Sequence, residues 1–132
     1  MSPELDAFGI VVSDMSRALM FYRALGLEFP EGAENEGHVE AQLPSGLRYM
    51  LDSEDVITSF DSDWKRPDGH VSGGAFRCET PEEVDVVYDA LLAAGGRSHK
   101  PPWDAFWGQR YAQVSDPDGT VVDLYAPLPE QS

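Results

Sequence analysis

The chain has 132 residues, of which 42% are hydrophobic and 11% aromatic, so it is long and apolar enough for one globular domain and too short for two. Its formal charge of −15, from 24 acidic and 9 basic residues, disfavours nucleic acid as a partner, because a phosphate backbone would be repelled. The single cysteine, Cys78, excludes an internal disulfide. The sequence has no run of about 18 apolar residues and no basic start followed by an apolar stretch, so we expect a cytoplasmic protein without a membrane span.

The chain begins with the signals of a strand followed by a helix. Residues 5–12 are rich in β-branched and apolar side chains, which is typical of a strand, and Asp14 stands where a helix N-cap is expected. From Met15 to Leu25 apolar residues recur at helical spacing, and Gly26 can adopt the left-handed conformation that ends a helix. We therefore predict a strand and then a helix in this region.

Two more strands are expected before the middle of the chain. They lie around residues 38–43 and 47–52, with Pro44-Ser45-Gly46 as the turn between them. Residues 53–70 carry acidic side chains, proline and glycine with weak periodicity. We interpret them as a connecting loop that could include one helical turn.

The same order of elements then starts again. Residues 74–78 read as a strand, and Thr80-Pro81-Glu82-Glu83 has the pattern of a capping box with proline at the first helical position. The apolar stripe from Val84 to Leu92, followed by Gly95-Gly96, predicts a second helix that ends at the glycines.

The last third of the chain contains an aromatic loop and a hairpin. The stretch from Trp103 to Trp107 follows Pro101-Pro102 and is interpreted as a loop, whereas residues 107–126 read as two strands joined by a turn at 116–119. In that turn a proline presets φ and a glycine takes the position where other residues are strained. Asp123 is then an acidic residue inside a β-strand, where a solvated position is the ordinary expectation.

The two halves of the chain repeat one pattern. Asp14 corresponds to Thr80, and Met50 in the first half corresponds to Asp123 in the second. Each half therefore reads as a β-α-β-β-β module. The modules span about residues 5–52 and 71–126, joined by a loop over about 53–70, within a single domain of residues 1–132.

This repeat predicts an α+β fold in which the modules pair with pseudo-two-fold symmetry. Each sheet would hold a helix on one face, and the other faces would curve around a shared cavity. Together with the repeat, residues 9–27, 75–85 and 116–125 are similar to the vicinal oxygen chelate superfamily, also called the glyoxalase/bleomycin resistance protein/dioxygenase family. It includes glyoxalase I, extradiol dioxygenases, fosfomycin-modifying enzymes and bleomycin-resistance proteins. The resemblance covers nearly the whole chain.

The resemblance implies a metal site for which this chain lacks the ligands. In metal-dependent members, a histidine from the first strand and a carboxylate from the last strand of each module hold a divalent cation that polarises the substrate. These four positions fall on Ala7, Met50, Gly73 and Asp123, so only the last carries a possible ligand. We therefore expect a metal-free protein without a cofactor. The alternative, a displaced metal site, would use histidines of this chain: His38, His70 and His99.

The cavity implied by the resemblance would have aromatic walls and few polar groups, a composition suited to a planar or amphipathic small molecule. A buried carboxylate needs a partner, so we expect Asp123 to pair with an arginine, a tyrosine hydroxyl or a cationic group of the ligand. Arg110 could serve there or could form a surface ion pair. The expected ligand-binding residues are Arg48, Met50, Phe60, Trp64, Trp103, Phe106, Trp107, Arg110, Tyr111, Asp123 and Tyr125.

These residues favour a metal-free, bleomycin-resistance-like binding protein for an aromatic or amphipathic molecule, for example a cationic antibiotic. The alternative is an enzyme of the same fold, a lyase, isomerase or hydrolase that uses Asp123 as general base and Arg110 or a tyrosine to stabilise an oxyanion. A metal-dependent glyoxalase or dioxygenase is disfavoured by Ala7, Met50 and Gly73. The resemblance also implies a homodimer.

Overall fold

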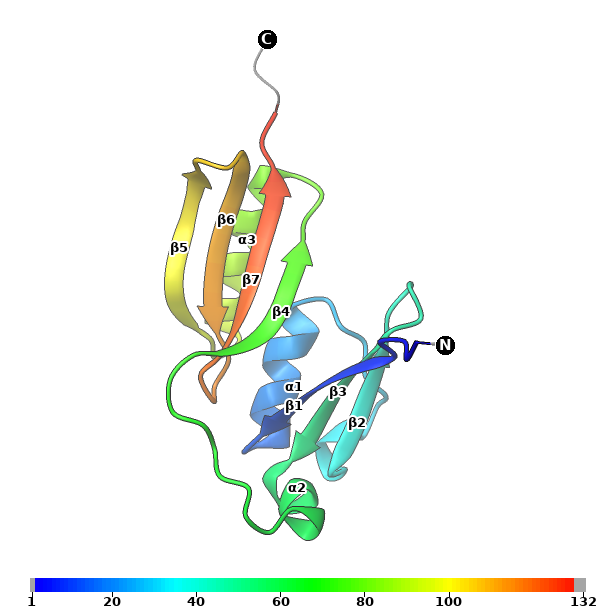
Figure 1. The fold of residues 1–132 in the computed structure, drawn as a ribbon. Coiled ribbons are helices and arrows are strands. Elements are labelled where there is room, and N and C mark those ends of the chain that lie inside the picture. Colours follow the sequence, from blue (N-terminus) through cyan, green and yellow to red (C-terminus); the bar gives the residue numbers. More distant parts are fainter. Residues whose placement is uncertain (1, 130–132) are drawn as a thin grey trace. The chain divides into compact units, whose positions relative to one another are not determined.

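The computed structural model describes residues 2–129 and has a mixed α+β fold with two β-sheets and three α-helices (Figure 1). This confirms the predicted fold class. The chain divides into two compact units, of which the first ends at Pro67 and the second begins at Asp68. Within residues 2–129 the helices are too short or too polar to traverse a bilayer.

The first unit contains one three-stranded sheet. Its strand order is β1-β3-β2, with β1 parallel and β2 antiparallel to the central strand. Among the residues described it has one strand fewer than the β-α-β-β-β pattern, because the polar, glycine-containing stretch after the first helix forms a 3-10 turn. The elements are β1 (Ala7–Val12), α1 (Met15–Ala24), the 3-10 helix η1 (Ala33–Asn35), β2 (His38–Gln42), β3 (Arg48–Ser53) and α2 (Glu54–Phe60).

Helix α1 begins and ends where the sequence predicts. The Asp14 carboxylate accepts a hydrogen bond from the backbone N–H of Arg17 at 3.1 Å, and Gly26 follows the helix with a φ of 108°. The helix buries Tyr22, whose ring centroid lies 5.7 Å from that of Tyr49 on β3. One face of this sheet therefore forms the core of the first unit with α1.

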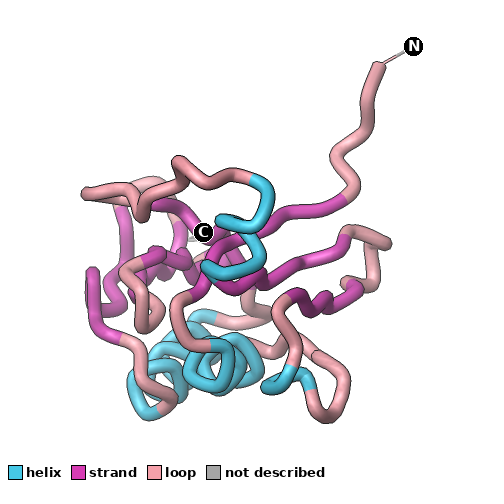
Figure 2. The backbone as a smooth tube through the Cα atoms, turned by 90° about the horizontal axis from the view of Figure 1, so that it is seen from below, coloured by secondary structure: helices cyan, strands magenta, loops and turns pink. Residues whose placement is uncertain are grey.

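Helix α2 is longer than the single turn expected between the modules (Figures 1 and 2). The Ser53 hydroxyl accepts from the backbone N–H of Val56 at 3.2 Å, and Glu54 and Asp55 place negative charge in the first turn, where the helix dipole favours it. None of the seven helical residues is fully buried. The length of this helix was not predicted, because it has capping signals but no apolar stripe.

The second unit has the complete β-α-β-β-β order. Its sheet runs β4-β7-β6-β5, with β4 parallel to β7 and antiparallel pairing elsewhere, and helix α3 lies on one face (Figure 1). The Thr80 hydroxyl caps this helix by accepting from the backbone N–H of Glu83 at 3.2 Å. The elements are β4 (Val71–Arg77), α3 (Pro81–Ala93), β5 (Arg97–Ala105), β6 (Gln109–Ser115) and β7 (Thr120–Pro127).

Strand β5 continues through most of the stretch interpreted as an aromatic loop. It includes Pro101, Pro102 and Trp103 and ends at Ala105. Proline cannot donate to a ladder, but β5 is an edge strand, and its pairing with β6 is bulged on both sides of Lys100. The loop interpretation was therefore wrong for the residues up to Ala105.

The β6–β7 hairpin forms around the predicted turn. Asp116 is almost fully buried, and its Oδ1 accepts hydrogen bonds from the backbone N–H groups of Asp118 at 2.8 Å and Thr120 at 2.9 Å. Gly119 has a φ of 92°, which favours glycine. The turn fixes the hairpin register, which pairs Ser115 with Val121.

The repeat recognised in the sequence is present in the sheet registers. In the first unit Gly9 pairs with Met50, and in the second unit Ala75 pairs with Asp123. In each case the first strand of the unit lies parallel to its last strand. The correspondence of Met50 with Asp123 is therefore confirmed within each sheet, whereas the pseudo-symmetric cavity stays a prediction.

Candidate functional site

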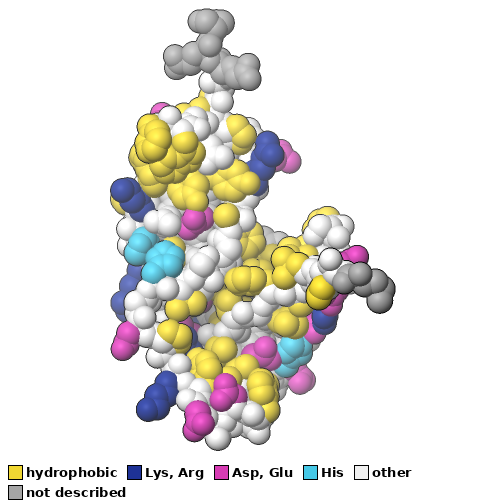
Figure 3. Space-filling model, viewed as in Figure 1, with side chains coloured by type: hydrophobic (Ala, Val, Ile, Leu, Met, Phe, Trp, Pro, Cys, Tyr) yellow, Lys and Arg dark blue, Asp and Glu magenta, His cyan; other side chains and the backbone are white. Residues whose placement is uncertain are grey.

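Aromatic side chains gather on the face of the second sheet opposite α3. Along β6, Arg110 bonds to Asp85 of α3 and Ala112 and Val114 are buried, so the alternate residues point to the other side. On this side Figure 3 shows hydrophobic side chains gathered over the end of β5 and the start of β6. We call this surface the aromatic face and define it by Trp103, Trp107, Tyr111, Tyr125 and Asp123.

The rings of the aromatic face pack edge to face around Tyr111. The centroid of Tyr111 lies 5.6 Å from that of Trp103 and 5.5 Å from that of Trp107, and the two tryptophan centroids are 5.9 Å apart with planes at 90°. Tyr125 is stacked on Tyr111 at 6.2 Å. These geometries are the favourable ones for aromatic pairs, so the rings hold one another in place.

Asp123 lies beside Tyr111 and accepts hydrogen bonds from two neutral side chains. The Tyr111 hydroxyl donates to its Oδ2 at 2.5 Å, and Nε2 of Gln113 donates to its Oδ1 at 2.9 Å. The tyrosine hydroxyl is one of the three partners that the sequence predicts for this carboxylate, and that prediction is confirmed. Burial, and then the hydrogen bond to Asp123, raises the pKa of Tyr111 to about 12, so the phenol stays protonated at neutral pH.

A row of residues crosses the sheet at the level of Asp123. The register pairs Lys100 with Gln113, Gln113 with Asp123, and Asp123 with Ala75. Ala75 is exposed and has only a methyl side chain, so the neighbour of Asp123 on β4 is small. The Lys100 ammonium lies 4.8 Å from the ring centroid of Trp103, a cation–π contact at the edge of the aromatic face.

Arg110 does not join Asp123. Its guanidinium faces α3, where Nε and Nη2 donate to the two carboxylate oxygens of Asp85 at 3.0 and 3.1 Å and Nη1 donates to Asp104 at 3.1 Å. These carboxylates raise the pKa of Arg110. The side chain lines a pocket of about 310 Å³ beside the start of α3. Of the two roles predicted for Arg110, the structure has the surface ion pair.

Phe106 lies at the turn between β5 and β6. Its side chain is 96% exposed, and its ring centroid is 5.0 Å from that of Trp107. The indole Nε1 of Trp107 donates to the side chain of Gln109 at 2.8 Å. Phe106 therefore extends the aromatic face to the turn between β5 and β6.

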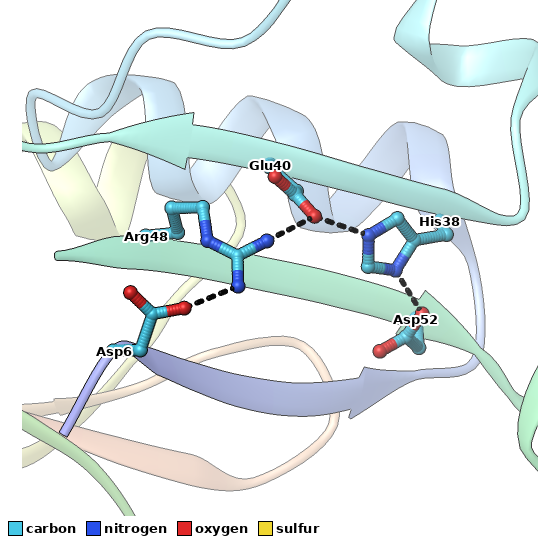
Figure 4. A network of polar contacts seen from close by, with 5 residues as sticks. All are labelled: Asp6, His38, Glu40, Arg48 and Asp52. Carbon is cyan, nitrogen blue, oxygen red and sulfur yellow. Dashed lines mark hydrogen bonds and ion pairs between the residues drawn. The ribbon is translucent and has the colours of Figure 1, made fainter. Parts of the chain in front are cut away.

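A second cluster, on the first unit, lies on the sheet face that does not pack against α1 (Figure 4). Arg48 donates to Glu40 at 3.0 Å and to Asp6 at 2.7 Å. His38 bonds through Nε2 to Glu40 at 2.8 Å and through Nδ1 to Asp52 at 2.5 Å, and these two carboxylates raise its pKa. We call these five residues the charged ladder.

The charged ladder was not recognised in the sequence, although its signal was present. His38 and Glu40 alternate with buried residues on β2, and Arg48 and Asp52 alternate with buried residues on β3. On two adjacent antiparallel strands, charged residues separated by an even number of positions lie on one face. Only the prediction that Arg48 shares a face with Met50 was made, and the strand pattern confirms it.

The remaining predicted residues of the first unit lie in different environments. Met50 approaches Gly9 so closely that a Cβ at residue 9 would lie 3.3 Å from the Met50 methyl carbon. Phe60 is 75% exposed at the end of α2, whereas Trp64 is half-buried with the Arg66 guanidinium 5.4 Å from its ring centroid. Ligand contact by these residues stays a prediction.

The side chains at the four positions of the family's metal ligands do not fit a metal. Ala7 and Gly73 carry no donor, Met50 carries a thioether that a hard cation does not favour, and both Asp123 oxygens accept hydrogen bonds. Across residues 2–129, no group of three or more histidine, cysteine, aspartate or glutamate side chains is arranged to hold a metal ion. His70 and His99 lie together, with ring centroids 5.7 Å apart.

Comparisons with known proteins agree on one family. A family model described as the Glyoxalase/Bleomycin resistance protein/Dioxygenase superfamily matches residues 4–124. No curated protein sequence gives a significant match. Solved structures with the same fold include a glyoxalase-related enzyme from Fulvimarina pelagi, with 19% identity over 93% of this chain and 87% of the other and a TM-score of 0.78.

Two further solved structures have similar coverage. A glyoxalase/bleomycin resistance protein/dioxygenase from Nocardioides is 23% identical over 100% of this chain and 91% of the other, with a TM-score of 0.72. A superfamily member from Sphaerobacter thermophilus is 28% identical over 95% of this chain and 98% of the other, with a TM-score of 0.66. The likeness therefore extends over nearly all of each chain.

Proposed function

Since this chain belongs to the Glyoxalase/Bleomycin resistance protein/Dioxygenase superfamily, we propose that it is a small-molecule binding protein whose aromatic face takes up an aromatic or amphipathic ligand. The observation that carries the proposal is the carboxylate of Asp123 bound to Tyr111, whose ring packs against those of Trp103, Trp107 and Tyr125. Aromatic side chains with one or two fixed polar groups are the usual lining of a small-molecule site.

The hydrogen bonds around Asp123 support a binding role. Tyr111 and Gln113 fix the orientation of the carboxylate before any ligand arrives. A preorganised group loses little conformational entropy on binding, so its interaction contributes fully to affinity. Each carboxylate oxygen has further acceptor capacity, which is available to a donor on the ligand.

We propose that this binding needs no metal. Of the four positions that hold the cation in metal-dependent relatives, only that of Asp123 has a suitable donor, and its oxygens already accept two hydrogen bonds. Elemental analysis of the purified protein tests this part of the proposal. Stoichiometric zinc, nickel, manganese or iron would contradict it.

An enzymatic role for Asp123 is the second candidate, and the Tyr111–Asp123 contact is the observation that favours it. A carboxylate and a phenol side by side can act as base and acid on neighbouring atoms of one substrate, once the Tyr111 hydroxyl turns its proton from Asp123 to the substrate. Asp123 would take a proton from the substrate, and the Tyr111 hydroxyl would donate to a developing oxyanion. Conversion of any bound compound to product, lost in Tyr111→Phe, would support this candidate over simple binding.

A thermal-shift screen followed by titration tests the binding role. We expect aromatic or amphipathic compounds to raise the melting temperature, and Asp123→Ala to weaken the affinity for the best of them by about tenfold, the loss expected for one charge-assisted hydrogen bond. Asp89→Ala removes an exposed carboxylate from α3 and serves as the matched control. Unchanged affinity in Asp123→Ala with unchanged stability would refute the role of Asp123.

We further propose that the protein forms a homodimer, as its family resemblance implies. The exposed ring of Phe106, which lies next to that of Trp107, supports an interface, because adjoining exposed apolar side chains are a common feature of protein contact surfaces. Size-exclusion chromatography with light scattering would give twice the chain mass. A monomer at micromolar concentration would contradict the proposal.

A further inference from the structure

The aromatic face already carries a cation of its own. The ammonium of Lys100 lies 4.8 Å from the ring centroid of Trp103, and the register places Lys100 beside Gln113 in the row that leads to Asp123. Lys100 itself is exposed and Trp103 is half-buried. The ring of Trp103 therefore has a surface that a positively charged group can reach from solvent.

The carboxylate of Asp123, in contrast, has no cationic side chain of the described residues bound to it. The two side chains that donate to it, Tyr111 and Gln113, are both neutral. Among residues 2–129 no lysine, arginine or histidine forms an ion pair with Asp123, and Arg110, one residue from Tyr111, faces α3 instead. A half-buried carboxylate without a counter-charge is stabilised by a cationic partner more than by a neutral one.

We propose that the ligand of the aromatic face is an aromatic organic cation, whose charged head displaces the Lys100 ammonium from Trp103 and lies next to Asp123. This inference rests on the proposed function and names its ligand class. No covalent step is involved, because the exchange replaces one bound cation by another and releases Lys100 into solvent.

The chemistry of the two cations decides the direction of the exchange. A lysine ammonium is compact and strongly hydrated, so water competes for it at an exposed site. A substituted ammonium or amidinium is less hydrated and gains more from the face of a tryptophan ring. The rings of Trp107 and Tyr111 lie beside Trp103 and can take the aromatic part of the same ligand. The charge of −15 also raises the local concentration of cations.

Three probes of similar size test the ligand class on the full chain. Benzyltrimethylammonium is the cation, its neutral carbon isostere neopentylbenzene keeps the shape, and benzenesulfonate reverses the charge. We expect the cation to quench the tryptophan fluorescence with saturation, and the other two probes to bind at least about threefold more weakly. The ε-methylene resonance of Lys100 should lose its ring-current shift as the cation binds.

Removal of the competing lysine makes the test specific. Lys100→Met should tighten binding of benzyltrimethylammonium by about two- to fivefold, the gain expected for one exposed cation–π contact. Lys65→Met removes the other lysine of the chain, an exposed residue of the first unit, and should leave the affinity unchanged. Asp123→Asn should weaken binding of the cation and leave binding of the neutral probe unaltered.

The outcomes separate the two proposals. Equal or tighter binding of the neutral or anionic probe, or unchanged cation affinity in Lys100→Met, would overturn the cation-exchange inference while the binding function stands. Binding of other compounds from the screen, with no binding of benzyltrimethylammonium, would likewise overturn the cation-exchange inference and leave the binding function intact. Failure of every compound to bind would overturn the proposed function and this inference together.

Discussion

The buried carboxylate in the hairpin turn offers a quantitative test of how the fold builds the site. Asp116 accepts hydrogen bonds from the backbone N–H groups of Asp118 and Thr120, and only 1% of its surface is exposed. Asp116→Ala would leave both donors without this acceptor. Each hydrogen bond to a buried charged group contributes on the order of 1.5 kcal/mol or more, so we expect a loss of about 3 kcal/mol in the free energy of unfolding.

The loss in stability should be accompanied by a loss of ligand affinity at the aromatic face. The turn sets the register of β6 against β7, and that register brings Tyr111 and Gln113 to Asp123. A fall of about 3 kcal/mol corresponds to a fall of roughly 10 °C in the melting temperature for a chain of this length. The affinity for a ligand of the aromatic face should fall in the same variant, because the frayed hairpin no longer holds the Asp123 carboxylate.

Thermal unfolding followed by circular dichroism measures the first effect. Asp116→Asn keeps an acceptor oxygen but loses the charge, so its melting temperature should lie between those of the wild type and Asp116→Ala. Asp89→Ala, which removes an exposed carboxylate from α3, should melt within about 2 °C of the wild type. A melting temperature for Asp116→Ala within the same 2 °C would refute the reasoning.

Three further predictions follow from other contacts. The two carboxylates beside His38 raise its pKa, so the stabilisation they provide is fully present below about pH 6.5 and is lost as the pH rises through the raised folded-state pKa. The difference in melting temperature between wild type and His38→Gln should therefore be larger at pH 5 than at pH 9. A difference that does not change with pH would contradict the ion pairs. Thr80→Ala removes the N-cap of α3 and should cost about 1 kcal/mol in chemical denaturation, whereas Thr80→Ser should restore most of it; equal stability of all three proteins would argue against the cap. Burial raises the pKa of the Cys78 thiol to about 11, so little of it is thiolate at pH 7.5. Iodoacetamide should therefore modify the native protein at this pH about 100-fold more slowly than the denatured chain. Similar rates would show that the thiol is accessible.

The parts of the fold that could be predicted are those whose local signals agree with their packing. Helix α3 has a capping threonine, a proline at its first turn and buried Val84 and Leu91 on one side, and the structure uses all of them. The hairpin turn likewise combines a proline, a glycine at positive φ and the buried Asp116. Such elements can be predicted from a sequence because their local and tertiary preferences agree.

The errors arose where tertiary context overrides a local signal. Pro101 and Pro102 indicate a loop in most contexts, but at the edge of a sheet their missing N–H groups cost nothing, so β5 continues through them. Helix α2 has the opposite problem, because its Ser53 cap is present but no apolar stripe marks its length.

The candidate site was predicted in its centre and less well at its borders. Asp123, Tyr111 and the tryptophans of the hairpin region lie together as expected. Arg110 does not, and strand alternation alone shows why: adjacent residues of one strand point to opposite faces, so Arg110 and Tyr111 cannot both reach Asp123.

The indole N–H resonances of the tryptophans give the most direct test of binding at the aromatic face. Of the three tryptophans in the chain, Trp103 and Trp107 belong to this face, and Trp64 lies in the first unit. In a ¹H–¹⁵N titration with the best compound from the screen, we predict that the Trp103 and Trp107 indole signals shift together and saturate at the affinity measured by calorimetry. Calorimetric binding that leaves both signals unshifted would contradict the assignment of the ligand site to the aromatic face.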